Sequence, residues 1–481
     1  MPHPSIHWFR RDLRLDENPA LVDAATRAAG LVIPVFVVDP TLVDSSRVGA
    51  NRLAFLYARL HTLDAELRAA GSGLVVLYGD PAVVLPEYAL KHAVAAVCWQ
   101  RDETPWASQR DQRVATQLQV MGIAVGIHDG QLLVPTDRIR SGGGTPYTVF
   151  TPFYRRWRDA LRLPDAIAAP SLIAHPEVQR VAAIPAPPAT NMTIPNTTAE
   201  YAYALRARFA ARRIDAYQRG RDMLAEAGTS MLSPYLRFGI VSIQSCARLA
   251  HAAEQQPTAA DGRTGAEVWL SELAWRDFYM HISVHFPHVL RGSFRQMYDA
   301  IAWENDETLF AAWCSGNTGY PIVDAAMRQL TTTGWMHNRA RMIVASFLTK
   351  DLLIDWRWGE RFFMQHLMDG DTPANNGGWQ WAAGTGTDAQ PYFRIFNPSS
   401  QGTRYDPDGL YVKKYIPALK NVPAKYIHAP WTMSSALQRQ YGITIGTDYP
   451  EPIVDHAAQR QRALALYAMV RGQTEHKKQD D

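Results

Sequence analysis

The stretch LVIPVFVVD, residues 31–39, is a short apolar run that reads as a buried strand and is too short to span a membrane. It is followed by NRLAFLYARLHTLDAELRAAG (51–71), in which leucines recur at spacings of three and four, and then by a second apolar run, GLVVLYGD (73–80). The leucine spacing predicts an amphipathic helix. Strand, helix and strand in this order predict a parallel βαβ unit.

The same alternation fills the first 130 residues. Three more apolar runs are separated by helical stretches: SIHWFR (5–10), AVCWQ (96–100) and IAVGIHD (123–129). Five strands with crossover helices predict an α/β domain with a doubly wound parallel sheet over residues 1–130. No G-x-G-x-x-G motif follows the first strand, so the usual dinucleotide cradle is not expected in this domain.

The character of the chain changes after this domain. Seven prolines interrupt any period between Pro164 and Pro195, which predicts an interdomain connector over residues 131–200. Strand signals nearly vanish beyond it, and helical segments follow one another, so a mostly α-helical domain is expected over 201–470. A short polar tail occupies 471–481. Two large domains suit a chain of 481 residues.

Composition sets broad limits on function. Charged residues make up 20% of the chain and the net charge is +3, which is compatible with nucleic acid but is also typical of many enzymes. Cys98, Cys246 and Cys314 lie far apart and lack metal-ligand spacing, so reduced thiols in a cytoplasmic protein without a bound metal are expected. The chain shows neither a signal peptide nor a membrane span, and we expect no membrane partner.

Two helical stretches carry side chains that suit ligands. GTSMLSP (228–234) offers three hydroxyls before a helical run, which fits a phosphate site or a plain N-cap. EVWLSELAWRDFY (267–279) puts Glu272, Trp275 and Arg276 on one helix face. A carboxylate beside an aromatic plane can bond a base edge while the ring stacks on it, although an amphipathic helix with a core Trp has the same pattern.

Two later stretches are also unusual. In WMHNRARM (335–342) a basic helix face is followed by an apolar one. This pattern fits the mouth of a cavity that binds a polyanion, although ordinary packing of a helix explains it too. DGDTPANNGGWQWAAGTGTD (369–388) gathers acids, amides, glycines and two tryptophans, yet no hydrolytic nucleophile–base pair stands out in it. A reaction with little acid–base machinery is therefore indicated.

Taken in order, these motifs resemble the photolyase/cryptochrome family, most closely the class I cyclobutane pyrimidine dimer photolyases. The matching segments are HWFRRDLRLDENPAL (7–21), GTSMLSPYLRFG (228–239), ELAWRDFY (272–279), TGYPIVDAAMRQL (318–330), GWMHNRARM (334–342), and DLLIDWRWGERFF, the 369–388 stretch and PYFRIFNPSSQ within 351–401. The resemblance implies a DNA-repair lyase with an FAD-binding helical domain. It further implies that reduced FAD, excited by near-UV or blue light, donates an electron to a flipped-out dimer and splits it into two pyrimidines.

The resemblance also implies roles at the matching positions. FAD is expected to be held by Tyr217, Thr229, Ser230, Met231, Leu232, Ser233, Trp269, Glu272, Arg276, Asn338, Arg341, Asp369, Asp371 and Asn375. The catalytic pocket is expected to comprise Glu272, Trp275, Asn338, Met342, Asn375 and Trp381. DNA is expected to contact Glu272, Trp275, Arg276, Arg339 and Trp381. Electron transfer is assigned to Trp303, Trp356 and Trp379, and a buried ion pair to Arg341 and Asp369.

Other members of the family are the alternatives. A (6-4) photolyase would carry two histidines where this chain has Asn338 and Met342. A DASH-type member is not expected to keep the GGWQWAAGTGTD pattern, and a flavoprotein that does not use light would have no use for the Glu272 pocket. A blue-light-sensing cryptochrome usually adds a long C-terminal tail. Asn375, rather than an acid, at the flavin N5 position favours the reduced flavin that repair needs.

A second, light-harvesting chromophore stays open. Arg52, Asp102 and Glu103 lie where ligands of a deazaflavin could fall, and Arg291 occupies a region where relatives that bind a reduced folate tend to offer Lys. Neither pattern is clean, and an empty antenna site also fits. The expected partner is DNA containing cyclobutane pyrimidine dimers, and we expect the protein to act as a monomer.

Overall fold

The computed structural model describes residues 3–44, 48–180, 182–255, 264–389 and 391–477. The chain divides into two compact units. The first unit comprises Met1–Gln218, Thr229–His285 and Met368–Asp371, and the second comprises Arg219–Gly228, Phe286–Leu367 and Thr372–Asp481. The first unit is therefore discontinuous in sequence. The domain boundaries drawn from composition at residues 130, 200 and 470 stay a prediction.

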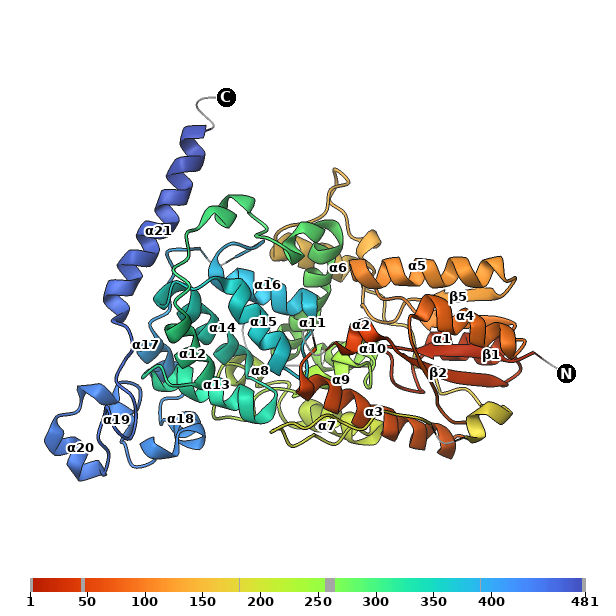
Figure 1. Ribbon diagram of the computed structural model, residues 1–481, viewed down its shortest axis with the longest axis horizontal. Coiled ribbons are helices and arrows are strands. Elements are labelled where there is room, and N and C mark those ends of the chain that lie inside the picture. The colour runs from red at the N-terminus through yellow and green to blue at the C-terminus, as the bar shows by residue number, and fades with distance from the viewer. Residues whose placement is uncertain (1–2, 45–47, 181, 256–263, 390, 478–481) are drawn as a thin grey trace. The chain divides into compact units, whose positions relative to one another are not determined.

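The first unit contains a five-stranded sheet in which all neighbouring strands are parallel (Figure 1). Its strands are β1 (Ser5–Phe9), β2 (Val32–Val38), β3 (Val75–Tyr78), β4 (Ala96–Gln100) and β5 (Ala124–His128), in the order β3-β2-β1-β4-β5. The central strand β1 pairs on one side with β2 and on the other with β4, so that Ser5 lies opposite both Val32 and Ala96. The predicted doubly wound sheet is confirmed.

Helices connect successive strands of the sheet along the chain. Those of the α/β region are α1 (Pro19–Arg27), α2 (Pro40–Val43), α3 (Ala50–Ala69), α4 (Pro81–Lys91) and α5 (Pro105–Val120). In α3 the side chains of Leu53, Leu60, Leu63 and Leu67 are buried, as their spacing predicts. Acidic and amide side chains followed by Pro begin several of these helices; Asn18, for example, accepts a hydrogen bond from the Leu21 N–H.

The predicted connector holds a helix that the proline pattern did not reveal. Helix α6 (Phe150–Ala160) buries Phe150, Phe153 and Trp157. The proline-rich part beyond it is mostly exposed and contains the short 3-10 turn η2 (Pro176–Gln179) and an isolated bridge from Ile173 to Leu31. The 3-10 turn η1 (Thr136–Arg138) precedes α6. The remaining helices of the first unit are α7 (Ala199–Arg212), α9 (Ser233–Arg237), α10 (Ile243–Glu254) and α11 (Gly265–His285). The short α8 (Tyr217–Gly220) includes the boundary between the two units.

Among its described residues, the regular elements of the second unit are helices and short helical turns, apart from an isolated bridge between Ile445 and Tyr449. Its larger helices are α12 (Glu307–Ser315), α13 (Pro321–Thr333), α14 (Asn338–Ser346), α15 (Trp356–His366), α16 (Thr372–Ala383), α17 (Pro398–Tyr405), α18 (Leu410–Tyr415), α19 (Ala424–Ile427), α20 (Ser435–Tyr441) and α21 (His456–Lys477). Short 3-10 turns join them: η3 (Pro287–Leu290), η4 (Gln296–Ala300), η6 (Pro417–Leu419) and η7 (Pro430–Thr432). The expected mostly helical second domain is confirmed.

One departure from the predicted helix pattern lies after α14. The sequence 338–353 predicts a single helix, but α14 ends at Ser346 and continues as a π-helical turn, η5 (Phe347–Asp351). A π-helical turn holds one more residue than an α-helical turn, and it is often found at functional sites. Among the described residues, no helix combines the length and the apolar character that crossing a membrane requires.

Candidate functional site

Helix α11 presents the two predicted pocket residues of the first unit. Glu272 and Trp275 lie one turn apart and are both half-buried. The indole of Trp275 stacks on Phe150 of α6, with ring centroids 3.7 Å apart and planes tilted by 7°. Phe150 therefore backs one face of the indole, and a half-exposed aromatic wall stands beside a carboxylate. Phe150 lies 125 residues away in sequence and was missed by motif reasoning.

An aromatic cluster joins two of the predicted cofactor residues. Trp269 of α11 is buried and contacts Phe209 of α7, with centroids 4.9 Å apart. Phe209 in turn meets Tyr217 edge-on at 5.7 Å. The structure thus brings Tyr217 and Trp269 together through Phe209, which the sequence analysis did not identify.

The segment Thr229–Ser233 forms a tight turn before α9. Met231 adopts a left-handed backbone conformation with φ of 56°, which is uncommon for a residue other than glycine. The Leu232 N–H donates to Ser230 Oγ at 3.4 Å, and Ser233 is exposed where α9 begins. A hydroxyl-rich turn at a helix start is a donor set that suits phosphate and ribose groups.

Asp371 lies at the centre of an arginine cluster in the first unit. Its carboxylate accepts a hydrogen bond from Arg11 and lies 3.7 Å from the Nε of Arg237. The neighbouring Gly370 carbonyl accepts from Arg237 at 2.9 Å and from Arg52 at 3.3 Å. Burial by itself raises the pKa of Asp371, but the nearby arginines outweigh it and hold that pKa below its usual range. Asp371 is therefore a fixed, ionised group.

Arg276 faces the same charge cluster. Its Nη1 donates to the Gln131 carbonyl at 2.6 Å and lies 3.9 Å from Asp277. Burial, followed by repulsion from Arg11, lowers the pKa of Arg276. Neither Arg11 nor Arg237 was selected from the sequence, although Arg11 belongs to the paired arginines of HWFRRDLR, a signal that could have indicated it.

Helix α14 carries the predicted pocket residues of the second unit. Asn338, its first residue, is exposed, and Met342, one turn later on the same face, is half-buried. Arg341 points back along the chain, and its Nε donates to the Met336 carbonyl at 2.9 Å. The ion pair expected between Arg341 and Asp369 joins residues of different compact units, and it stays a prediction.

Arg339, the predicted phosphate contact, is already engaged. Its guanidinium forms an ion pair with Asp222 at 2.8 Å and lies 4.4 Å from the ring centre of Tyr405. The exposed Arg404 approaches the same ring at 5.3 Å. Tyr405 thus lies close to two guanidinium groups, of which that of Arg339 is partly neutralised. Asp222 and Tyr405 could not be connected with Arg339 from sequence, because they lie on other elements.

The three predicted electron-transfer tryptophans share one hydrophobic cluster of the second unit. Trp356 and Trp379 are 1% and 2% exposed within it, and the half-buried Trp303 packs against it. Trp356 begins α15, and Gly359 follows one turn later. A Cβ at Gly359 would lie 2.1 Å from the Trp379 ring, so only glycine permits this close approach of α15 to α16.

Amide side chains of α16 hold α15 in place. Asn375 Nδ2 donates to the Glu360 carbonyl at 3.0 Å, and Asn376 Nδ2 donates to Glu360 Oε1 at 2.9 Å. Gln380 Nε2 continues the chain to Asn376 Oδ1 at 3.0 Å. Burial raises the pKa of Glu360 to about 7. The adjacent Asn-Asn pair of the motif was noticed in sequence, but only Asn375 was given a role. Trp381, on the same helix, is half-buried.

Several of these features fit a flavin dinucleotide. The hydroxyl-rich turn after Gly228 suits phosphates. The aromatic rings of Trp269, Phe209 and Tyr217 are buried against one another. In the second unit the indole Nε1 of Trp379 is buried and has no hydrogen-bond partner within the described residues, which leaves a donor for a bound group. No set of three metal-ligating side chains gathers anywhere in those residues.

The residues considered for an antenna chromophore are tied to the protein. Asp102 lies 3.8 Å from Arg11, and Glu103 accepts a hydrogen bond from the Thr136 N–H at 3.2 Å. Glu103 also lines a small cavity with the residues that follow strand β5, among them Asp129 and Gln131. Arg291, the position considered for a folate, is exposed at the end of η3.

Comparison with known proteins shows similarity along almost the whole chain. A family described as "DNA photolyase" matches residues 5–171, and "FAD binding domain of DNA photolyase" matches residues 269–469. A protein of Synechococcus sp. named deoxyribodipyrimidine photo-lyase is 42% identical over 97% of each chain. The crystal structure of a class III photolyase from Agrobacterium tumefaciens is 35% identical, with a TM-score of 0.90 over 98% of each chain. A cryptochrome structure from Synechocystis sp. is 30% identical, with a TM-score of 0.87 over 97% of this chain and 99% of that one.

Proposed function

We propose, on the premise that this chain belongs to the DNA photolyase family, that it repairs cyclobutane pyrimidine dimers in DNA by a light-driven reaction. The chain carries the FAD-binding domain of that family. The observation that carries the proposal is the half-exposed Trp275, backed by Phe150 and standing one helical turn from Glu272. A flat apolar wall beside a carboxylate suits a flipped-out dimer of two adjacent bases better than a polar metabolite.

The residues of α11 would recognise the damaged bases. Trp275 offers its ring to the dimer, and its contact with Phe150 keeps that ring from turning away. Glu272 would bond the base edges, where loss of a hydrogen bond inside a desolvated pocket is costly. A dimer stacks and pairs poorly, so extruding it costs less than extruding intact bases. Motif position alone assigns Asn338, Met342 and Trp381 to the same lesion.

The basic residues beside α14 would hold the DNA backbone. The ion pair with Asp222 partly neutralises the charge of Arg339, whereas Arg404 is exposed near the same Tyr405 ring. Phosphate contacts position a nucleic acid without reading its sequence. Binding by these residues should therefore be similar for damaged and intact DNA, and it should weaken as salt rises.

When bound, FAD supplies the light absorption and the electron that opens the dimer. The protein's own part is to hold the groups and to keep water out. Trp303, Trp356 and Trp379 would pass electrons inward from the surface and so restore the reduced cofactor, a role that the burial of Trp356 and Trp379 in one apolar cluster supports. We also propose that the protein acts as a monomer and that any antenna chromophore is a reduced folate or a deazaflavin.

The test is repair of defined oligonucleotides by the purified protein. A duplex with one thymine dimer should be restored under near-UV or blue light and stay unrepaired in darkness, while a (6-4) photoproduct should stay unrepaired in both. FAD should be released on denaturation, and the absorption spectrum of the native protein should reveal any second chromophore. Equal repair in darkness, or a protein without flavin, would refute the proposal.

Similarity to the Synechocystis cryptochrome gives the second candidate function, a blue-light sensor. A sensor would respond to light with a change in the protein but would leave the dimer intact. The same illuminated duplex therefore separates the two functions. Spectral change without repair would favour the sensor, and repair would favour the lyase.

A further inference from the structure

Asp277 is a buried carboxylate of α11 that lies two residues after Trp275 and is 1% exposed. Three donors converge on its Oδ2 atom: the indole N–H of Trp157 at 3.0 Å, and the backbone N–H groups of Leu133 and Val134 at 2.9 and 3.1 Å. A charged acceptor makes stronger hydrogen bonds than a neutral one. Asp277 therefore ties together three parts of the first unit, namely α6, α11 and the chain that follows β5.

The carboxylate of Asp277 is ionised at pH 8 although it is buried. Burial raises the pKa of Asp277 to about 6, while the positive charge of Arg276 and the hydrogen bonds that the carboxylate accepts act against this rise. Arg276 Nη1 lies 3.9 Å from the other oxygen, Oδ1, which accepts no hydrogen bond within the described residues. All three donors thus depend on the position of one atom, Oδ2.

Helix α6 meets α11 through one of its faces. Phe150 and Trp157 are seven residues apart, so they lie within about 20° of each other around the helix axis. Phe150 and Phe153 meet Phe278 of α11 edge-on, with ring centroids 5.7 and 5.0 Å apart. Apolar burial holds the two helices together but has little directionality, so it leaves the rotation of α6 about its own axis loosely defined. The hydrogen bond from Trp157 to Asp277 is directional and fixes that rotation.

We propose that Asp277 is a positioning residue for the recognition of damaged bases. Its bond to Trp157 fixes the rotation of α6, and this rotation keeps Phe150 behind Trp275. The stack of Phe150 on the indole is close, with ring centroids 3.7 Å apart, so a small rotation of α6 would open it. An indole without this backing can turn and loses part of its stacking on the lesion. The inference rests on the proposed function, because it requires that Trp275 receives the dimer.

Asp277 also stabilises the chain that follows β5. Its bonds to two backbone N–H groups of this chain are matched by Arg276, one residue earlier, whose Nη1 donates to the Gln131 carbonyl at 2.6 Å. Two consecutive residues of α11 therefore hold both ends of the segment 131–134. Loss of the whole carboxylate would disturb this segment as well as α6. The decisive variant is therefore Trp157→Phe, which removes only the bond to α6.

The experiment compares the affinity of the intact flavin-loaded protein for a duplex with one thymine dimer and for the same duplex without it, at pH 8. Trp157→Phe should lower the preference for the damaged duplex by about 2- to 12-fold, the full worth of an aromatic pair such as Phe150 and Trp275. Affinity for the undamaged duplex should not change. Flavin content and light-driven reduction of the flavin should also match the wild type.

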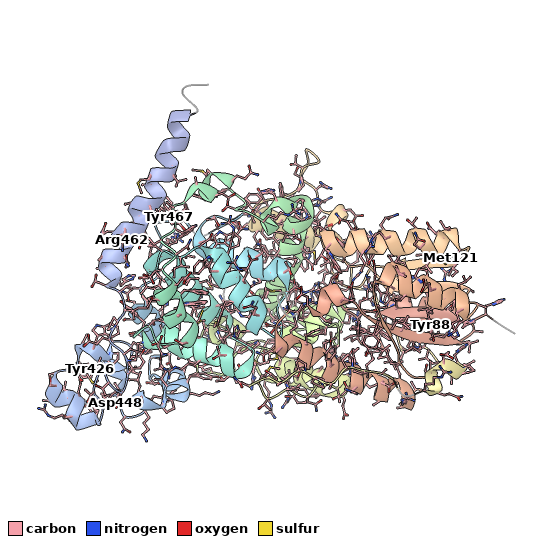
Figure 2. The ribbon with its side chains drawn as sticks, in the orientation of Figure 1. Tyr88, Met121, Tyr426, Asp448, Arg462 and Tyr467 are labelled. Carbon is pink, nitrogen blue, oxygen red and sulfur yellow. The ribbon has the colours of Figure 1, made fainter. Side chains whose placement is uncertain are left out.

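The matched control is Trp99→Phe. Trp99 of β4 is as buried as Trp157, but its indole N–H has no hydrogen-bond partner within the described residues. It belongs to the apolar cluster of the sheet against which Tyr88, labelled in Figure 2, packs. This variant removes the same ring atoms as Trp157→Phe without removing a hydrogen bond. It should therefore keep the wild-type preference for damaged DNA.

Variants of Asp277 itself complete the test. Asp277→Asn keeps an oxygen that can accept from Trp157, so it should retain most of the preference. Asp277→Leu removes the acceptor and should lower the preference at least as much as Trp157→Phe. Adding Trp157→Phe to Asp277→Leu should lower it no further, because both substitutions break the same bond.

The outcomes separate this inference from the proposed function. If the wild type neither prefers nor repairs the dimer, both are overturned. If the wild type prefers the dimer and Trp157→Phe keeps this preference, only the inference fails. An equal loss in Trp99→Phe, or an equal loss on both duplexes, would also overturn the inference, because a general loosening of the unit would then explain the effect. Should Asp277→Leu not fold, the comparison of Trp157→Phe with Trp99→Phe decides the matter.

Discussion

Two groups of aromatic residues in this molecule use tryptophan in opposite ways. The pocket cluster, Phe150 and Trp275, leaves the indole half-exposed with one face backed by a phenyl ring. The relay cluster, Trp303, Trp356 and Trp379, buries two of its three indoles almost completely. A half-exposed ring can receive another flat group, whereas a buried ring can only exchange charge with its neighbours. Exposure therefore separates Trp275 from the two buried relay indoles, Trp356 and Trp379, whereas Trp303 is half-buried like Trp275.

The largest expected effect follows from breaking the relay cluster in its middle. Trp356→Phe keeps an aromatic ring at the start of α15 but removes the indole that can carry charge. Light-driven reduction of oxidised flavin should fall to background, while repair by chemically reduced protein continues at its normal rate. Absorption spectra under blue light and repair assays after dithionite treatment measure the two activities. Loss of both would show that the clusters are not functionally separate.

The next largest effect is expected from substitution of Glu272, which lies on α11 one turn from Trp275 of the pocket cluster. Glu272→Ala should weaken binding of dimer-containing DNA by about 5- to 150-fold, because losing a buried hydrogen bond costs about 1–3 kcal/mol. Affinity for undamaged DNA should barely change, which makes the undamaged duplex the control. Binding isotherms on both duplexes test this expectation. Equal weakening of the two would move the recognition of damage away from Glu272.

The pH dependence of the free energy of unfolding tests the burial of Glu360, which lies on α15, the helix that begins with Trp356. Burial raises the pKa of Glu360 to about 7, above its unfolded value of 4.5, so the folded state holds the proton more strongly. The corresponding stability is complete below pH 4.5 and is lost as pH rises through 7. Glu360→Gln, which keeps an oxygen for Asn376, should remove this loss and stabilise the protein at pH 8 by on the order of 1–2 kcal/mol. Urea unfolding at pH 5 and pH 8 gives the comparison, and an unchanged pH slope in the variant would contradict the assignment.

A smaller effect is expected from the wall behind Trp275. Phe150→Leu keeps the site apolar but removes the stacked partner of the indole, and such aromatic pairs are worth about 0.5–1.5 kcal/mol. Affinity for damaged DNA should drop by about 2- to 12-fold, with flavin photoreduction unchanged. Fluorescence anisotropy with dimer-containing DNA measures the drop. Wild-type affinity would mean that Trp275 is held by other contacts.

The smallest expected effect concerns binding to the DNA backbone. This binding should depend on neither the pocket cluster nor the relay cluster. Asp222→Asn releases the Arg339 guanidinium from its ion pair. Binding to damaged and undamaged DNA should strengthen by about 2- to 5-fold, the typical value of a partly exposed pair. The logarithmic salt dependence should steepen by up to about 0.9, as for one more neutralised phosphate. A gain confined to damaged DNA would place Arg339 in the pocket instead.

The fold could be predicted where a local sequence pattern strongly favours one three-dimensional arrangement. Apolar runs such as Val32–Val38, separated by a helix with buried leucines, are typical of a parallel sheet whose faces are covered, and the structure confirms all five strands. The π-helical turn Phe347–Asp351 had no such signal. Its residues have an ordinary helical pattern, which gives no sign of the extra residue per turn.

The candidate site divides in the same way. Neighbours along one helix, such as Glu272 and Trp275, follow from the helical period and could be proposed from sequence. Their partners could not, because Phe150 for Trp275 and Asp222 for Arg339 come from distant segments that only tertiary packing brings close. The roles assigned to the motif residues stay predictions, and the structure adds the contacts through which each can be tested.

The strand order of the sheet and the discontinuous sequence of the first unit affect how the protein folds during its synthesis. β1 lies at the centre of the sheet and needs β4, about ninety residues later, before both its edges are paired. The unit is then completed only by Thr229–His285 and finally by Met368–Asp371. At typical rates of synthesis, roughly 20–75 s pass before residue 371 has left the ribosome's active centre. During that time the emerging α/β segment lacks part of its own packing, so the nascent chain should depend on chaperones longer than its early, regular sequence suggests.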